Sequence, residues 1–115
     1  LGDSVTFSGF VNPIEAMGRS DMIVQLSVWE NCSYTLLDAK AAGLKTVATA
    51  VGGNPEILGA DELVDRQSAT LTQDVLQAMR AQLQKDESEP FAWISNEQMA
   101  AQTVDIYTRV LRGGR

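Results

Sequence analysis

The sequence predicts an α/β protein built on a Rossmann-like parallel sheet of about four strands with flanking helices. Short apolar or β-rich runs alternate with helix-like segments, an order typical of parallel sheets with right-handed crossovers. The chain has 115 residues, which suits one domain, and its 44% of hydrophobic residues is enough for a packed core. We therefore expect residues 1–115 to form a single Rossmann-like domain.

The first half of the chain supplies two of the expected strands. Val5–Val11 alternates in polarity and is rich in β-formers, and the turn residues Asn12 and Pro13 end it. One or two helical turns follow over Ile14–Gly18. Asp21–Leu26 is a nearly continuous apolar run, as expected for a strand that is buried on both faces.

The middle of the chain continues the alternation. Tyr34–Ala42 lacks Gly and Pro and stops before Gly43, a residue typical of helix ends, so we expect a helix. Thr46–Ala50 is predicted to form the third strand. After a glycine turn, Pro55–Leu58 suits a short helix, because Pro is favoured at the first helical position.

The last third is predicted to hold one brief strand, over Glu62–Val64, and two longer helices, at about 71–86 and 94–112. Apolar residues recur at helical spacing in both helices. We expect Trp93 and Tyr107 to hold these helices against the core.

Composition excludes several classes of function. Nine Lys and Arg stand against fifteen Asp and Glu, a net charge of −6 without a basic cluster, which disfavours nucleic-acid and anionic-membrane binding. No apolar run approaches the ~20 residues of a membrane span. The chain has no His and one Cys, Cys32, so it offers no imidazole base, internal disulfide or thiolate zinc site. A lone thiol fits a cytoplasmic location, and Lys40 and Lys45 are expected to be solvated.

Ligands of parallel α/β sheets bind at the carboxyl ends of the strands. The loops expected there are Gly9–Asn12, Ser27–Ser33 and Ala50–Pro55. Ser33 is a good N-cap for the helix that follows, whose first amides and positive dipole end suit a phosphate.

Two acidic residues eight positions apart, Glu30 and Asp38, can flank that helix start. Carboxylates accept hydrogen bonds from sugar hydroxyls, so a phosphate site between two of them suits a nucleotide-sugar. On spacing alone, two solvated surface charges remain an equal alternative. Gly52 and Gly53 allow close approach to a ligand, although taken alone they favour an ordinary turn.

A long set of motifs extends this interpretation. Three motifs follow one another along the chain: Leu26-Ser27-Val28-Trp29-Glu30, then Leu36-Leu37-Asp38-Ala39-Lys40-Ala41-Ala42-Gly43, and then Thr46-Val47-Ala48-Thr49-Ala50-Val51-Gly52-Gly53-Asn54-Pro55-Glu56-Ile57-Leu58. Together they resemble the donor-binding half of the group-1 (family 4) retaining glycosyltransferases of the GT-B fold. That family reads roughly PSxxE, seven residues, EAMAxGxPVVAT, then xVGGxxEIL.

The resemblance implies transfer of a sugar from a nucleotide-sugar to an acceptor, with retention and without a metal or further cofactor. It makes Glu30 the catalytic carboxylate facing the sugar hydroxyls and Asp38 the ribose ligand. It places the Ser33–Thr35 helix start at the diphosphate, with the Tyr34 and Thr35 amides facing it. Gly9 to Val11 would lie beside the nucleobase, and Gly52 and Gly53 near the donor.

The departures from the family pattern also carry expectations. Asp38 replaces Glu, Leu26 and Lys45 replace Pro, and Lys40 replaces Met. The acceptor domain and the first two donor-domain strands, with their Gly-rich loop and cations, have no counterpart here. We therefore expect a partial nucleotide-sugar-binding domain that is inactive alone and forms a homo-oligomer or domain swap through an exposed sheet edge.

Two other functions remain open. The chain could be a non-catalytic interaction or oligomerisation module derived from such a fragment. A nucleotide-sugar epimerase shares the architecture, but no epimerase-specific residue is visible.

Overall fold

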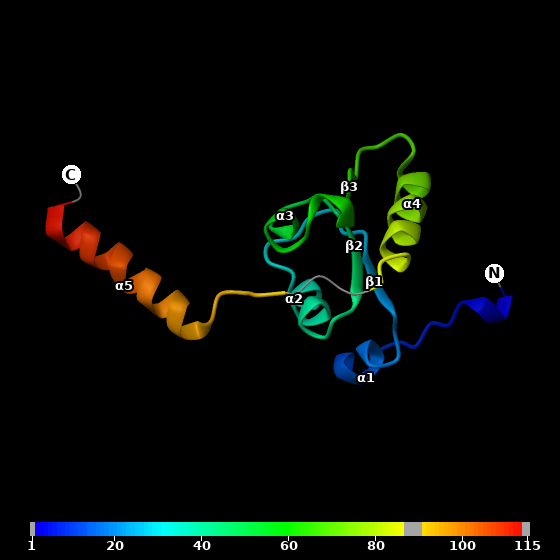
Figure 1. Ribbon diagram of the computed structural model, residues 1–115, viewed down its shortest axis with the longest axis horizontal. Helices are drawn as coiled ribbons and strands as arrows, with labels where there is room; N and C mark the ends of the chain where they lie inside the picture. Colours follow the sequence, from blue (N-terminus) through cyan, green and yellow to red (C-terminus); the bar gives the residue numbers. More distant parts are fainter. Residues whose placement is uncertain (1, 87–90, 114–115) are drawn as a thin grey trace.

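A computed structural model describes residues 2–86 and 91–113 and contains a parallel sheet of three strands (Figure 1). These are β1 (Met22–Gln25), β2 (Lys45–Thr49) and β3 (Leu63–Val64), in the order β1-β2-β3. Met22 lies opposite Lys45, and Ala48 lies opposite Leu63. Because the strands are parallel, the residues that follow Gln25 and Thr49 emerge at the same edge of the sheet.

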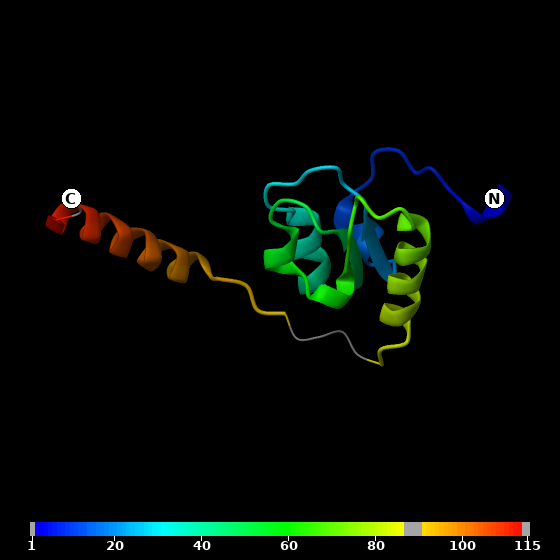
Figure 2. The same cartoon turned by 90° about the horizontal axis from the view of Figure 1, so that it is seen from above.

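The strand predicted over Val5–Val11 is not formed, so the sheet has three strands rather than about four. A short 3₁₀ turn, η1 (Gly2–Ser4), lies away from the sheet, and the chain then runs toward α1 without pairing with a strand (Figures 1 and 2). Phe7 is 95% exposed. A strand needs a neighbour to satisfy its backbone groups, and within the described residues this segment has none.

Five α-helices and a second 3₁₀ turn complete the described chain. In order they are α1 (Pro13–Met17), α2 (Tyr34–Ala41), α3 (Asn54–Ile57), η2 (Ala60–Glu62), α4 (Leu71–Leu83) and α5 (Asn96–Gly113). Local sequence explains several of the boundaries. Asn12 Oδ1 accepts from the Ile14 amide at 2.9 Å and caps α1. Gly43, with φ of +74°, follows α2 in the left-handed conformation that glycine adopts readily.

The sheet is covered on both faces, as the alternation of helices and strands predicts. Leu36 of α2, Ala48, Ile57 and Leu58 form a core on one face, and Val47, Val64 and Val75 of α4 form a core on the other. Successive residues of β2 therefore point to opposite helical layers. Figure 2 shows α2 and α3 on one side of the strands and α4 on the other.

Helix α5 extends away from this three-layer body and has no buried residue (Figure 1). The molecule consequently measures 63 × 34 × 30 Å. Phe91 packs against the α2 side of the core, and Trp93 stacks on Phe91 with ring centroids 6.1 Å apart. Tyr107 is exposed. The expectation that Trp93 and Tyr107 both hold the last helices to the core is therefore wrong for Tyr107.

Candidate functional site

Two of the three predicted loops meet at the carboxyl edge of the sheet. The Gly53 amide donates to the Asn31 carbonyl at 3.0 Å, and Thr49 Oγ1 donates to the Ser27 carbonyl at 2.6 Å. The Ser27–Ser33 loop, after β1, is thereby attached to the Ala50–Pro55 loop, after β2.

Both glycines of the second loop are required by this contact. A Cβ atom on Gly52 would lie 1.5 Å from the Glu30 carbonyl oxygen, and one on Gly53 would lie 2.2 Å from that of Asn31. Gly52 also has φ of +52°. Gly52 and Gly53 therefore have a packing role that needs no ligand, and their predicted contact with a donor remains a prediction.

Glu30 is half-buried in the first loop, with one carboxylate oxygen fixed. Its Oε1 atom accepts from Gln25 Nε2 at 2.6 Å and from Ser27 Oγ at 2.7 Å. Within the described residues no donor contacts its Oε2 atom. The side chain is thus held at one oxygen while the other can accept a hydrogen bond, as a ligand hydroxyl would require.

Ser33 begins α2 as its sequence predicts. The buried Ser33 Oγ accepts from the Leu36 amide at 3.3 Å. The amides of Tyr34 and Thr35, in the first helical turn, donate to no acceptor among the described residues. This start is the kind of helix end that binds anions, and Glu30 lies in the loop that leads into it.

Asp38 lies in α2, five residues after its N-cap Ser33. It is exposed and lines a groove of about 570 Å³ between α1 and α2, together with Ile14, Met17 and Ala41 among others. No hydrogen bond or ion pair among the described residues joins Asp38 to Glu30. The predicted arrangement of two acids around one ligand therefore remains a prediction.

Gly9 and Val11 belong to the unpaired N-terminal segment. A Cβ on Gly9, whose φ is +65°, would meet no atom within 4 Å. Neither residue contacts the Glu30 loop through a hydrogen bond in the described part of the chain. The structure does not bring Gly9 and Val11 to the other predicted site residues.

Gln25 and Asn54 were not predicted from the sequence. Gln25 links Glu30 to the start of α2 by hydrogen bonds. The sequence does mark Gln25 as unusual, because it is the one polar residue in the apolar run Met22–Leu26. Asn54 is completely buried, and its Nδ2 atom donates to the Thr49 carbonyl at 3.0 Å. Its Oδ1 atom has no partner among the described residues.

A second polar cluster lies at the amino-terminal edge of the sheet. Lys40 Nζ and Glu62 Oε1 are 2.9 Å apart, and both side chains are more than nine-tenths buried. Burial raises the pKa of Glu62, but hydrogen bonds from Thr46 and Lys40 outweigh it, so the pKa lies below its ordinary value. The Lys45 Nζ atom is also buried, without a hydrogen-bond partner in the described chain. The expectation that Lys40 and Lys45 are solvated is therefore wrong.

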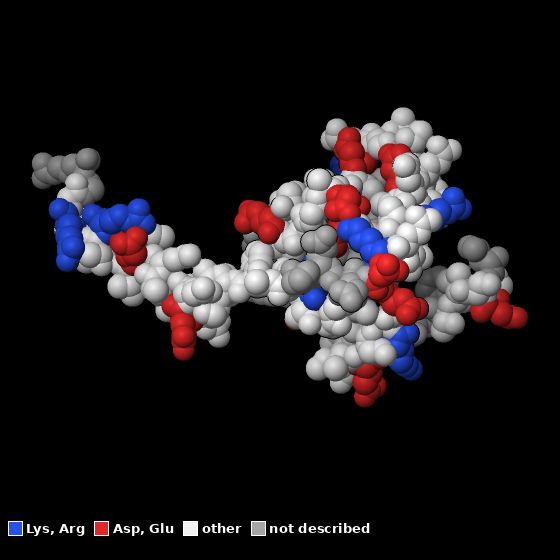
Figure 3. Space-filling view, viewed as in Figure 1, with Lys and Arg blue, Asp and Glu red and all other residues white. Residues whose placement is uncertain are grey.

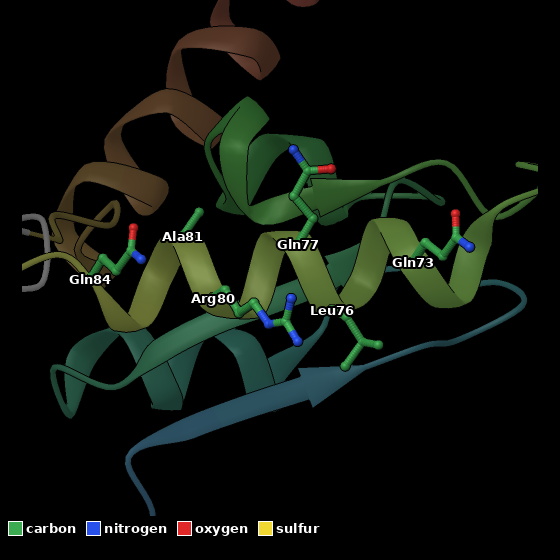
Figure 4. A pocket seen from close by; sticks show the side chains of 6 residues that line it. All are labelled: Gln73, Leu76, Gln77, Arg80, Ala81 and Gln84. Carbon is green, nitrogen blue, oxygen red and sulfur yellow. The ribbon is translucent and has the colours of Figure 1, made fainter.

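Another hollow, of about 520 Å³, lies along the outer surface of α4 (Figure 4). It is lined by α4 and its C-cap residue Gln84, and no predicted site residue contributes. One helix surface cannot enclose a ligand, so we assign no function to it.

Charge and metal-binding groups give no competing site on the described chain. On the face seen in Figure 3 acidic and basic side chains are dispersed over the body, and basic ones gather near the end of α5. Within residues 2–86 and 91–113 no three metal-ligating side chains converge. Over the same residues, no helix combines the length and apolarity that crossing a membrane requires.

The comparisons with known proteins give one match. A family model described as glycosyl transferases group 1 matches residues 1–98. No curated protein and no solved structure matches the chain. The matched range includes the sheet, α1 to α4 and both loops at its carboxyl edge.

Proposed function

The chain belongs to the group 1 glycosyltransferases, and from this premise we propose that it binds the nucleotide-sugar donor of a retaining sugar transfer. In that reaction the bond from the anomeric carbon to the diphosphate breaks. The oxygen of an acceptor hydroxyl then forms the new bond on the same face of the sugar, and its proton passes to the departing diphosphate. The diphosphate leaves with the electron pair, so the site must bind an anion and sugar hydroxyls together.

The observation that carries the proposal is the open Oε2 atom of Glu30 in the loop that enters α2. This atom accepts a hydroxyl of the donor sugar, and the amides of Tyr34 and Thr35 donate to the diphosphate. Asp38, one turn further along α2, binds the ribose. These roles need no metal, since the helix start supplies the donors.

We further propose that this chain alone turns over little donor. A departing diphosphate needs placed cations or donors, each often worth about 3 kcal/mol in the transition state. Lys45 lies at the first position of β2, at the opposite end of the strand from the loop. Lys40 is occupied by Glu62. Neither cation can neutralise a charge at the start of α2.

Calorimetric titration with nucleoside diphosphates and their sugar conjugates tests the donor site. We expect Glu30→Ala and Asp38→Ala to weaken binding of the sugar conjugates at least about tenfold, because each removes a charge-assisted hydrogen bond. Glu97→Ala removes one negative charge from the exposed surface of α5 and is the matched control. Full-strength binding by both site variants would contradict the proposal.

A second candidate function, a self-associating module, is favoured by the open edge of β1. Within the described residues β1 pairs with β2 alone, so the side of β1 that faces away from β2 has no partner strand. Val24 in β1 and Leu26 directly after it are exposed. Unpaired strand edges invite strand addition, and the unpaired Val5–Val11 of a second copy is a suitable strand. Sedimentation velocity of the full chain should then show a dimer that Val24→Lys dissociates. A monomer at all concentrations would exclude this function.

A further inference from the structure

Gln25 is the last residue of β1 and occupies an unusual position for a polar side chain. It shares a face of the strand with Ile23, which packs against the core beneath α2. The side chain of Gln25 therefore points toward the start of α2 rather than to solvent. Such a position favours an apolar residue unless both ends of the amide are satisfied.

One end of the amide holds the carboxylate of Glu30. Gln25 Nε2 donates to Glu30 Oε1 at 2.6 Å and to Ser27 Oγ at 3.2 Å. Ser27 Oγ in turn donates to the same Oε1 atom at 2.7 Å. Two donors thus fix one carboxylate oxygen of Glu30, which sets the direction of the other.

The other end of the amide holds the start of α2. Gln25 Oε1 accepts from Ser33 Oγ at 2.8 Å, and Ser33 Oγ accepts from the Leu36 amide at 3.3 Å. A continuous chain of hydrogen bonds therefore runs from the Glu30 carboxylate through Gln25 to the helix amides. It joins the two parts of the site that would bind the sugar and the diphosphate.

The orientation of the Gln25 amide follows from its partners. If the amide were flipped, its oxygen would face the Glu30 carboxylate oxygen at 2.6 Å, and two acceptors would repel each other. With the nitrogen toward Glu30 and the oxygen toward Ser33, every contact joins a donor to an acceptor. The arrangement therefore requires a donor toward Glu30 and an acceptor toward Ser33 at position 25, and the Gln25 amide supplies both.

We propose that Gln25 is a positioning residue that aims the Oε2 atom of Glu30 at the sugar and locks the loop to the start of α2. This inference rests on the proposed function for its ligand, a nucleotide-sugar. Gln25 itself does not touch the donor. Its loss should reduce the contribution of the sugar to binding and leave the contribution of the diphosphate unchanged.

The test compares the affinities of the full chain for a nucleoside diphosphate and for its sugar conjugate. In Gln25→Met, which keeps the length of the side chain but removes both polar ends, we expect the preference for the conjugate to fall about tenfold. The affinity for the bare diphosphate should change less than about twofold. Gln73→Met makes the same replacement at an exposed position of α4 and should change neither affinity.

A double-variant cycle tests whether Gln25 acts through Glu30. Glu30→Gln combined with Gln25→Met should lose no more sugar preference than Glu30→Gln alone, because both changes remove one function. An unchanged preference in Gln25→Met would overturn the proposal. Equal weakening of both ligands would also overturn it, since that result shows a general structural role.

Hydrogen exchange measured without ligand tests the role of Gln25 independently of the proposed function. The Gly53 amide, bonded to the Asn31 carbonyl, reports whether the Glu30 loop is docked. Its hydrogen exchange should accelerate at least about tenfold in Gln25→Met and stay constant in Gln73→Met. If the unmodified chain binds no nucleotide, the proposed function fails, and unchanged Gly53 exchange then overturns the positioning role as well. Gln25→Asn, which shortens the amide, replaces Gln25→Met if that variant does not fold.

Discussion

Strand β2 and the Val5–Val11 segment have similar compositions and opposite structures. Both are rich in Val, Thr and other β-forming residues. In β2 the four residues Thr46–Thr49 are completely or almost completely buried, between two strands and two helical layers. In Val5–Val11 the side chains are exposed and no strand forms. The comparison shows that neighbours, rather than intrinsic β propensity, decide which segment becomes a strand.

The first prediction compares the stability lost on truncating one side chain in the buried body and one in the exposed Val5–Val11 segment. Leu36 is completely buried beneath the sheet and Phe7 is almost fully exposed. Leu36→Ala should lower the free energy of unfolding by about 3–5 kcal/mol, because it loses apolar burial and leaves a cavity. Phe7→Ala should change it by less than about 0.5 kcal/mol.

Urea unfolding followed by far-UV circular dichroism checks both values. A loss of more than about 2 kcal/mol in Phe7→Ala would mean that the N-terminal segment packs against something in solution. The body and the N-terminal segment would then both be packed, and the difference between them would not exist in solution.

The second prediction compares a glycine in the packed body, Gly52, with a glycine in the exposed N-terminal segment, Gly9. Gly52→Ala should cost about 3 kcal/mol, since its Cβ would collide with the Glu30 carbonyl and its φ is positive. Gly9 also has a positive φ but has open space around it, so Gly9→Ala should cost no more than about 1 kcal/mol. Thermal unfolding midpoints of the two variants measure the difference. Equal midpoints would contradict the contact between the two loops.

Sequence reasoning predicted the elements of the body well because each has a local signal. Ser33 marks the start of α2 and Gly43 its end, and the apolar run at Asp21–Leu26 marks β1. The strand at Val5–Val11 failed because pairing depends on segments far away in the sequence. A pattern of period two carries no information about whether a partner exists.

The site was predictable only in part for a similar reason. The loops follow from parallel topology, which places Glu30 and Gly53 at the same edge. The link through Gln25 could not be predicted, because it depends on the side chain of a strand residue reaching a helix cap eight positions further on. Burial of Lys40 beside Glu62 likewise depends on two segments 22 residues apart.

The third prediction concerns the cluster at the other edge of the sheet. Lys40→Met should lower the free energy of unfolding by about 2–3 kcal/mol, because Glu62 then remains buried without its cation. Lys40→Met combined with Glu62→Met should recover part of the loss, since no charge is left buried. Urea midpoints of the single and double variants test this. A double variant less stable than the single one would show that Glu62 has other essential partners.

The smallest expected effect is the contribution of Glu62 to the pH dependence of the free energy of unfolding. Its pKa lies below the ordinary value of 4.5, so the folded state binds its proton more weakly than the unfolded state. The stabilisation is therefore complete above about pH 4.5 and is lost as the pH falls through the lower folded value. Asp61, whose pKa is lowered chiefly by a hydrogen bond from Lys85, adds to the same loss at the exposed surface.

Glu62→Gln isolates the part due to the buried acid. Its free energy of unfolding should depend less steeply on pH between about 5 and 3 than that of the unmodified chain, because the variant has no carboxylate to protonate at position 62. Glu97→Gln, on the exposed surface of α5, serves as the control and should keep the original slope. If Glu62→Gln and Glu97→Gln had the same slope, the carboxylate at position 62 would have the same affinity for protons in both states. The hydrogen bonds from Thr46 and Lys40 would then not favour its ionised form.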